Sequence, residues 1–399
     1  MLSFWLVCLV YFSRALTTNA WLVGAALGLA ILTKGTAYIF AAPFVAVTAV
    51  HAAWRRRSRA VLVFAVIVCA VLALNAGHYG RNVRLYGTPL GPGREGASVY
   101  ANEAMGPARL VGNAVKNVAL HVGTPIDAVN QWLARGVEGL HRQLGVDVHD
   151  PATTWPSTTF EIARPRRFED LAGNPWHVLV IAASSAMLAI VPSLRRRRDL
   201  VIYLGAIAAG GLLFALLLKW QPWHSRLHLP LFVLSAPLVG VVWERHRRAT
   251  ALLALGLLVA SVPWVVDNES RPLIGGQSVL VRSRADQYFK NLGGLRAPYT
   301  EAVEHVREAR CTYVGLWTGE SPEYLLWVLT QTLRAARLRL EHVDVQNESG
   351  RLPSRLGDSV DPCAILVTFE LPDKPETVDH RMSRYRLNFR SPPVSLFLR

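Results

Sequence analysis

The chain has 399 residues, of which 51% are hydrophobic, and its 43 Lys and Arg against 28 Asp and Glu give a formal net charge of +15. Such apolar content with a strong basic excess is unusual for a soluble domain and is typical of a membrane protein whose inner loops are basic. The charge distribution excludes a nucleic-acid-binding protein, because much of the basic excess lies in short clusters directly between apolar runs.

Eight apolar segments predict a mainly α-helical protein, a polytopic bundle of transmembrane helices. The segments cover residues 2–13, 20–33, 36–53, 60–77, 176–193, 200–218, 229–243 and 249–266. A span needs about 20 apolar residues, so the first two are short, and the second and third could instead form one broken or re-entrant element. We expect spans within 1–77 and 176–266, a long loop at 78–175 and a separate domain at 267–399.

Three basic clusters predict the orientation of the bundle. They lie between predicted spans, at residues 55–59, 195–198 and 245–248. Basic loops tend to stay in the cytoplasm, and placing all three there makes every span alternate correctly. The loops 78–175 and 219–228 and the tail 267–399 then lie outside. We therefore expect a multi-pass protein of the bacterial cytoplasmic (inner) membrane, with an extracytoplasmic C-terminal domain.

The same alternation places Met1 outside, directly before an apolar run. A membrane protein that starts in this way is unusual. We therefore expect that the bundle lacks spans that would precede Met1.

The loop 78–175 is too long for a simple connection. Apolar residues recur with helical spacing at 107–121 and 125–144, which predicts two amphipathic helices. These helices either lie on the outer face of the membrane or pack on the protein itself.

The tail predicts a small α/β unit, because strand and helix patterns alternate in it. We expect helices from Thr300 to Arg310 and from about Pro322 to Arg337, and strands at 311–317, 340–345, 363–369 and 385–389. Cys311 and Cys363 begin two of these strands. A disulfide between them is possible, but we expect two separate core thiols, since free cysteines are usually buried.

Cations at the predicted outer face are the candidate functional residues. Residues 219–230, KWQPWHSRLHLP, join two long apolar runs and contain Lys219 and Arg226, while Lys34 lies between two apolar runs in ILTKGTAYIF. Cations beside a span cost energy unless they lie in water or meet an anion. Lys34 could simply snorkel to the interface. Arg81 follows the fourth span on the outer side, which favours a bound anion or lipid headgroups.

Histidines and tryptophans share the 219–230 stretch. His224 and His228 are four residues apart, a spacing that can bind zinc, but no third ligand is evident. We therefore expect no metal and no cofactor. Trp220 and Trp223 are interpreted as interfacial anchors.

Three motifs in order resemble the GT-C superfamily of integral membrane glycosyltransferases, which includes protein mannosyltransferase-like and aminoarabinose transferase-like enzymes. They are LTKGTA at residues 32–37, RNVRLYGTPLG at 81–91 and WHSRLHLP at 223–230. The resemblance covers about residues 1–266. It implies transfer of a sugar from a polyprenyl-phosphate donor to an acceptor, here unidentified, on the extracytoplasmic face. By this resemblance Lys34 and Arg226, and then Lys219, contact the donor phosphate, and Arg81 is a further candidate. The resemblance also leads us to expect that His224 hydrogen-bonds the sugar or phosphate, with sugar stacking as the alternative role for Trp220 and Trp223.

The chain departs from the family in its acidic residue. In the family, an acid in the loop after the first span acts as catalytic base or organises the acceptor, and this chain has no such loop. The catalytic residue is therefore unknown, and we expect the chain to be inactive by itself. The acids of the later loop are interpreted as solvated: Asp127, Asp147, Asp150, Glu161 and Asp170.

Two other classes of function compete with the enzyme. A transporter or flippase for an anionic lipid or sugar would usually have inverted repeats and polar residues near mid-membrane, whereas the charges here gather at the outer face. A non-catalytic membrane subunit that presents its soluble tail to a partner is the other alternative.

Overall fold

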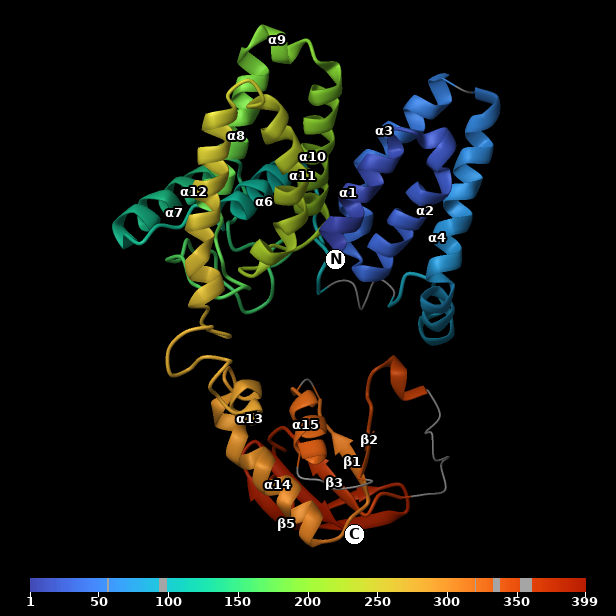
Figure 1. Cartoon of the computed structure of the whole chain (residues 1–399). Helices are drawn as coiled ribbons and strands as arrows, with labels where there is room; N and C mark the ends of the chain where they lie inside the picture. The colour runs from blue at the N-terminus through green and yellow to red at the C-terminus, as the bar shows by residue number, and fades with distance from the viewer. Residues whose placement is uncertain (56, 93–98, 320, 333–337, 352–360) are drawn as a thin grey trace. The chain divides into compact units, whose positions relative to one another are not determined.

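The computed structural model describes residues 1–55, 57–92, 99–319, 321–332, 338–351 and 361–399. The chain divides into two compact units, Met1–Glu269 and Ser270–Arg399, which we describe separately (Figure 1). The first unit is a helical bundle, and the second is built around a sheet.

The N-terminal unit contains eight apolar helices, one for each predicted apolar segment. They are α1 (Leu2–Ser13), α2 (Leu16–Thr33), α3 (Thr36–Arg55), α4 (Arg57–Tyr86), α8 (Pro175–Ile190), α10 (Arg198–Leu217), α11 (Leu229–Val242) and α12 (Arg247–Val266). Within the described residues, five stretches are long and apolar enough to span a membrane: Thr36–Trp54, Arg59–Tyr86, Arg198–Leu217, His224–Val242 and Arg247–Val266. The remaining apolar helices, at Leu2–Ser13, Thr18–Thr33 and Pro175–Ile190, are shorter.

α2 and α3 are two consecutive helices with a break between them, as either two spans or one broken element would be. The break falls at Lys34, whose extended backbone (φ −164°, ψ 136°) ends α2. The chain turns there, and the Lys34 carbonyl accepts a hydrogen bond from the Ala37 N–H at 2.9 Å. Lys34 therefore lies at an end of the bundle.

Glycines on α2 set how closely it approaches α4. A Cβ atom on Gly24 would lie 2.8 Å from the carbonyl oxygen of Ile67, and one on Gly28 would lie 2.9 Å from Leu74. Asn75 Nδ2 donates to the Gly28 carbonyl across the same contact at 3.0 Å. Small residues let apolar helices pack backbone to backbone, so α2 and α4 form a closely packed pair. Lys34 lies at the end of α2.

The α9–α10 and α11–α12 junctions lie together at one end of the N-terminal unit (Figure 1). The short helix α9 (Pro192–Arg195) directly follows α8 there. Arg197 Nη1 lies 3.4 Å from Glu244 Oε1 and joins the two junctions. These are the places where two of the predicted basic clusters lie.

The loop between α4 and α8 contains the two predicted helices, α6 (Pro107–Ala119) and α7 (Asp127–Gln143). α6 packs on α10 and buries Asn113, Lys116 and Asn117, whereas Val111 and Val118 are exposed. Its polar face therefore points into the protein and its valines point outward. Packing on the protein is confirmed for α6, and the outward valines leave contact with a membrane open.

The C-terminal unit is a six-stranded mixed sheet in the order β2-β1-β3-β6-β5-β4. The strands are β1 (Tyr313–Trp317), β2 (Arg339–His342), β3 (Ala364–Val367), β4 (Thr377–His380), β5 (Ser383–Ser391) and β6 (Val394–Leu398). β1 pairs in parallel with β2 and β3, and the other pairs are antiparallel. The predicted strands correspond to β1, β2, β3 and β5, whereas β4 and β6 are absent from the sequence prediction.

Helices α14 (Arg296–Glu308) and α15 (Tyr324–Thr332) contribute to the larger of the unit's two hydrophobic clusters, together with residues of β1, β3 and β6. Both correspond to predicted helices, although part of the second prediction, residues 333–337, lies outside the described residues. Short turns of helix complete the described part of the unit: α13 (Arg284–Tyr288), η2 (Gly293–Leu295) and η3 (Glu348–Arg351).

Cys311 and Cys363 form a disulfide, so the expectation of two separate thiols is wrong. Their Cα atoms are 5.7 Å apart. The parallel register of β1 and β3, in which Val314 lies opposite Ala364, brings the two preceding cysteines within bonding distance. This register cannot be derived from either strand alone.

The disulfide predicts how many thiols react. Under denaturing conditions without reductant, alkylation should label only Cys8 and Cys69, which are free. After reduction, mass spectrometry should find label on Cys311 and Cys363 as well. Labelling of all four cysteines before reduction would contradict the disulfide.

Candidate functional site

The stretch 219–230 starts inside the protein and is not an exposed loop. Leu218 forms an antiparallel bridge with Ala101, and Trp220 forms a parallel bridge with Thr154. The stretch is therefore threaded between two segments of the long loop. This pairing satisfies backbone groups that would otherwise be buried without partners.

Lys116 and Trp220 contact each other where the 219–230 stretch passes between the two loop segments. Trp220 has no exposed surface, and its Nε1 donates to the Lys116 carbonyl at 3.2 Å. The Lys116 amine lies 5.6 Å from the centroid of the Trp220 ring and donates to the Val148 carbonyl at 3.1 Å and to Thr154 Oγ1 at 2.9 Å. Trp220 is thus an interior residue and not an interfacial anchor.

Lys219 is buried and already has a carboxylate partner. Its side chain is 4% exposed, and its Nζ lies 2.5 Å from Glu103 Oε1, whose side chain is 57% exposed. A phosphate that contacted Lys219 would have to compete with this ion pair. Arg226 also has a carboxylate partner, but its side chain is 47% exposed, so the buried Lys219 is the weaker candidate for the first contact with an anion.

His224 also points into the protein. It is 1% exposed, its Nδ1 lies 3.1 Å from Asn117 Oδ1, and its ring lies against Phe214, with centroids 4.8 Å apart. His228 Nδ1 lies 2.9 Å from His121 Nε2. In this conformation His224 offers almost no surface to a sugar or phosphate. No group of three or more His, Cys, Asp or Glu among the described residues is arranged to hold a metal ion.

Arg226, by contrast, reaches the surface and forms an ion pair with Asp170, and the charges of both act on Lys34. Arg226 Nη1 donates to Asp170 Oδ1 at 2.8 Å, and the two side chains are 47% and 34% exposed. Ser225 Oγ donates to the Asp170 carbonyl at 2.9 Å and fixes that backbone. We call Lys34, Asp170 and Arg226 the cation cluster.

The charges of Arg226 and Asp170 act on Lys34 through space, since no hydrogen bond or ion pair joins the Lys34 side chain to them among the described residues. Partial burial lowers the pKa of its amine, the charge of Arg226 lowers that pKa further, and the charge of Asp170 raises it. Lys34 is nevertheless exposed, and a Cβ on Gly35 would meet no atom within 4 Å. The surface beside Lys34 is therefore open to a ligand.

Arg81 lies on the last part of α4 and is exposed. Near it, the hydroxyls of Tyr38 and Tyr79 are 2.7 Å apart and join α3 to α4. Among the described residues, no hydrogen bond or ion pair joins Arg81 to the cation cluster. Arg81 is therefore a separate exposed cation, whereas the charge of Arg226 acts on Lys34.

Asp170 is the functional candidate that the sequence interpretation misses. It was among five acids interpreted as solvated, and it lies 56 residues before its partner. Two of the other acids also form ion pairs, Asp127 with Arg164 and Asp150 with Arg109. Loop arginines and acids are too numerous for sequence alone to pair them.

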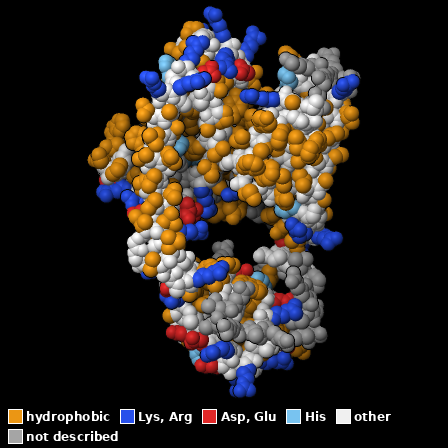
Figure 2. Space-filling view, in the orientation of Figure 1, with side chains coloured by type: hydrophobic (Ala, Val, Ile, Leu, Met, Phe, Trp, Pro, Cys, Tyr) orange, Lys and Arg blue, Asp and Glu red, His pale blue; other side chains and the backbone are white. Residues whose placement is uncertain are grey.

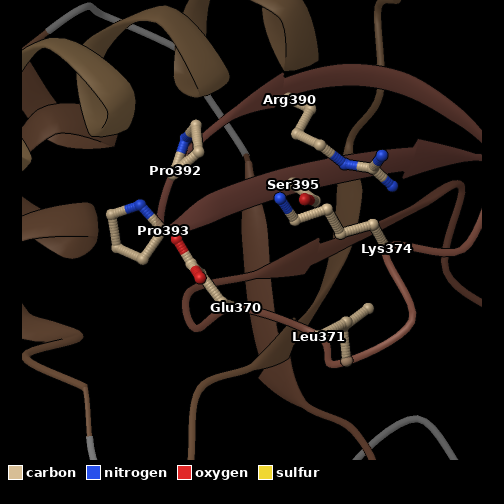
Figure 3. A pocket seen from close by; sticks show the side chains of 7 residues that line it. All are labelled: Glu370, Leu371, Lys374, Arg390, Pro392, Pro393 and Ser395. Carbon is tan, nitrogen blue, oxygen red and sulfur yellow. The ribbon is translucent and has the colours of Figure 1, made fainter.

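The C-terminal unit has a small surface pocket (Figure 3). Its lining residues are Glu370, Leu371, Lys374, Arg390, Pro392, Pro393 and Ser395. Arg390 Nη2 already donates to the Pro375 carbonyl at 2.5 Å. The pocket mixes both signs of charge, and the residues predicted to bind phosphate all lie in the other unit.

No family model matches the chain, and no curated protein or solved structure matches it either. Its function must therefore be argued from the residues themselves.

The buried amine of Lys116 predicts how the stability of the protein depends on pH. Burial lowers the pKa of its amine from 10.5 to about 8, against the opposing charges of Asp150 and Asp147. Between these values the unfolded chain binds more protons than the folded protein, so stability rises with pH in this window. Relative to the Lys116→Met variant, the free energy of unfolding of the wild type should increase by up to about 3 kcal/mol as the pH rises from about 8 to about 10. One unit of pKa shift corresponds to about 1.4 kcal/mol.

Thermal unfolding of both proteins in detergent, followed by circular dichroism across this pH range, measures the difference. A difference between wild type and variant that stays constant with pH would contradict the buried, charged lysine.

Proposed function

We propose that this protein is a membrane glycosyltransferase that moves a sugar from a polyprenyl-phosphate donor to an acceptor on the extracytoplasmic face. The observation that carries the proposal is the cation cluster. Two cations from distant parts of the sequence, Lys34 and Arg226, interact electrostatically, and Asp170 supplies a counter-charge that acts on both. The cluster keeps a positive excess at an accessible place beside apolar helices.

The chemistry of this cluster fits the leaving group of the transfer. The acceptor oxygen forms a bond to the anomeric carbon, the bond from that carbon to the phosphate oxygen breaks, and its electron pair stays on the lipid phosphate. Preorganised Lys and Arg side chains stabilise the negative charge that develops there. The apolar helices around the cluster suit the hydrocarbon tail of a polyprenyl chain.

Asp170 holds Arg226 when no donor is bound. Its ion pair keeps the guanidinium in one place at 2.8 Å, and an incoming phosphate would compete for the same donors. Among the described residues, the Lys34 side chain forms no hydrogen bond or ion pair, so we propose it as the first contact of the phosphate. Arg226 would then exchange Asp170 for a phosphate oxygen.

Two observations support the proposed orientation in the bacterial inner membrane. The Cys311–Cys363 disulfide is typical of an oxidising compartment, which favours a C-terminal unit outside the cytoplasm. The arginine clusters between the apolar helices favour the cytoplasm for the opposite end of the bundle.

Charge removal in the cluster tests the proposal. Lys34→Gln and Arg226→Gln should each weaken binding of a polyprenyl-phosphate sugar by about 10-fold to 100-fold, because hydrogen bonds to charged groups contribute about 1.5–3 kcal/mol. The measurement is retention of labelled donor by the purified full chain, because no catalytic acid is identified and sugar transfer is not expected of the chain by itself. Arg164→Gln is the matched control, since Arg164 forms another exposed ion pair, with Asp127, in the 78–175 loop that also contains Asp170.

The proposal fails if the wild type retains no donor from a panel of polyprenyl-phosphate hexoses and pentoses. It also fails if both cluster variants retain donor as well as the Arg164 control does. Donor movement across a bilayer without sugar transfer would favour a transporter instead.

A further inference from the structure

A basic patch lies at the α9–α10 and α11–α12 junctions of the N-terminal unit. It consists of six exposed arginines: Arg195, Arg196, Arg198, Arg245, Arg247 and Arg248. Figure 2 shows Lys and Arg side chains gathered at this end of the helical unit. The proposed glycosyl transfer makes no use of them.

Local ion pairs leave this patch with a large positive excess. Arg197 lies 3.4 Å from Glu244 and 3.5 Å from Asp199, so one arginine accounts for both nearby acids. The six patch arginines form no ion pair with the described residues. Trp243 Nε1, which donates to Ser184 Oγ at 3.0 Å, holds the α11–α12 junction against α8. The backbone of the two junctions is therefore held in place, and the six arginines on it are exposed.

α12 begins in this patch and is covered by little of the protein. It is a 20-residue apolar helix with no buried residue. Its exposed large apolar side chains are Leu252, Leu255, Leu258, Val259, Val262 and Val265. A helix of this length and composition needs hydrocarbon around it, which puts the arginines at its start level with lipid headgroups.

We infer that the basic patch is a binding site for an anionic phospholipid. The headgroup phosphate lies between the arginines of the two junctions, and the acyl chains run along the exposed apolar side of α12. Guanidinium groups bind phosphate oxygens in a bidentate manner, and clustered basic residues beside a span select anionic over zwitterionic headgroups. Charge complementarity and the uncovered helix together favour a lipid over a protein partner.

Native mass spectrometry of the full chain tests this inference. Protein purified in a neutral detergent is mixed with phosphatidylglycerol or with phosphatidylcholine of the same acyl chains. We expect the wild type to retain phosphatidylglycerol at least tenfold better than phosphatidylcholine. The triple variant Arg245→Gln, Arg247→Gln, Arg248→Gln should lose this preference.

A matched triple variant controls for the change in net charge. Arg307→Gln, Arg310→Gln and Arg386→Gln remove three exposed arginines of the C-terminal unit and should leave the preference intact. Circular dichroism checks that both variants stay helical. If the patch variant does not fold, the wild type is tested alone, and high salt should then abolish its preference for the anionic lipid.

Three results would overturn the inference. These are equal retention of both lipids by the wild type, an unchanged preference in the patch variant, and an equal loss in the control variant. A dimer that persists after all lipid is removed, and that the patch substitutions dissociate, would assign the surface to a second copy of the chain instead.

Discussion

The burial of Lys116 is the constraint on which the arrangement of the N-terminal unit depends. A buried amine must be bonded, and Lys116 finds its acceptors at Val148 and Thr154, both in the long loop. Its backbone carbonyl in turn accepts from Trp220. One residue of α6 thus fixes both the loop and the start of the 219–230 stretch. Arg226 follows a few residues later and emerges at the surface beside Asp170.

This arrangement separates the cations that the sequence groups together. Lys219 and His224 turn inward to Glu103 and Asn117, and they connect the stretch to the loop. Arg226 turns outward, where its charge lowers the pKa of Lys34 at the end of α2. The 219–230 stretch starts in the interior and then runs to the surface. Lys219 is therefore buried against Glu103, whereas Arg226 is exposed and accessible to a ligand.

Apolar length and spacing predict the helices well, because a bundle of this kind needs little more than long apolar runs. The eight segments and both loop helices were predictable for this reason. The disulfide was not, because it depends on the register of β1 against β3. The inward polar face of α6 and the Asp170–Arg226 pair were not predictable either, because each depends on a partner far away in the sequence.

The pH dependence of Lys34 acylation tests the cation cluster most directly, since only a neutral amine reacts. Peptide mass spectrometry would follow the reaction in the wild type, in Asp170→Asn and in Arg226→Gln. The charges around Lys34 predict that Asp170→Asn lowers its pKa and makes it react at lower pH, whereas Arg226→Gln raises the pKa and requires higher pH. An unchanged profile in both variants would contradict the cluster and, with it, the proposed phosphate site.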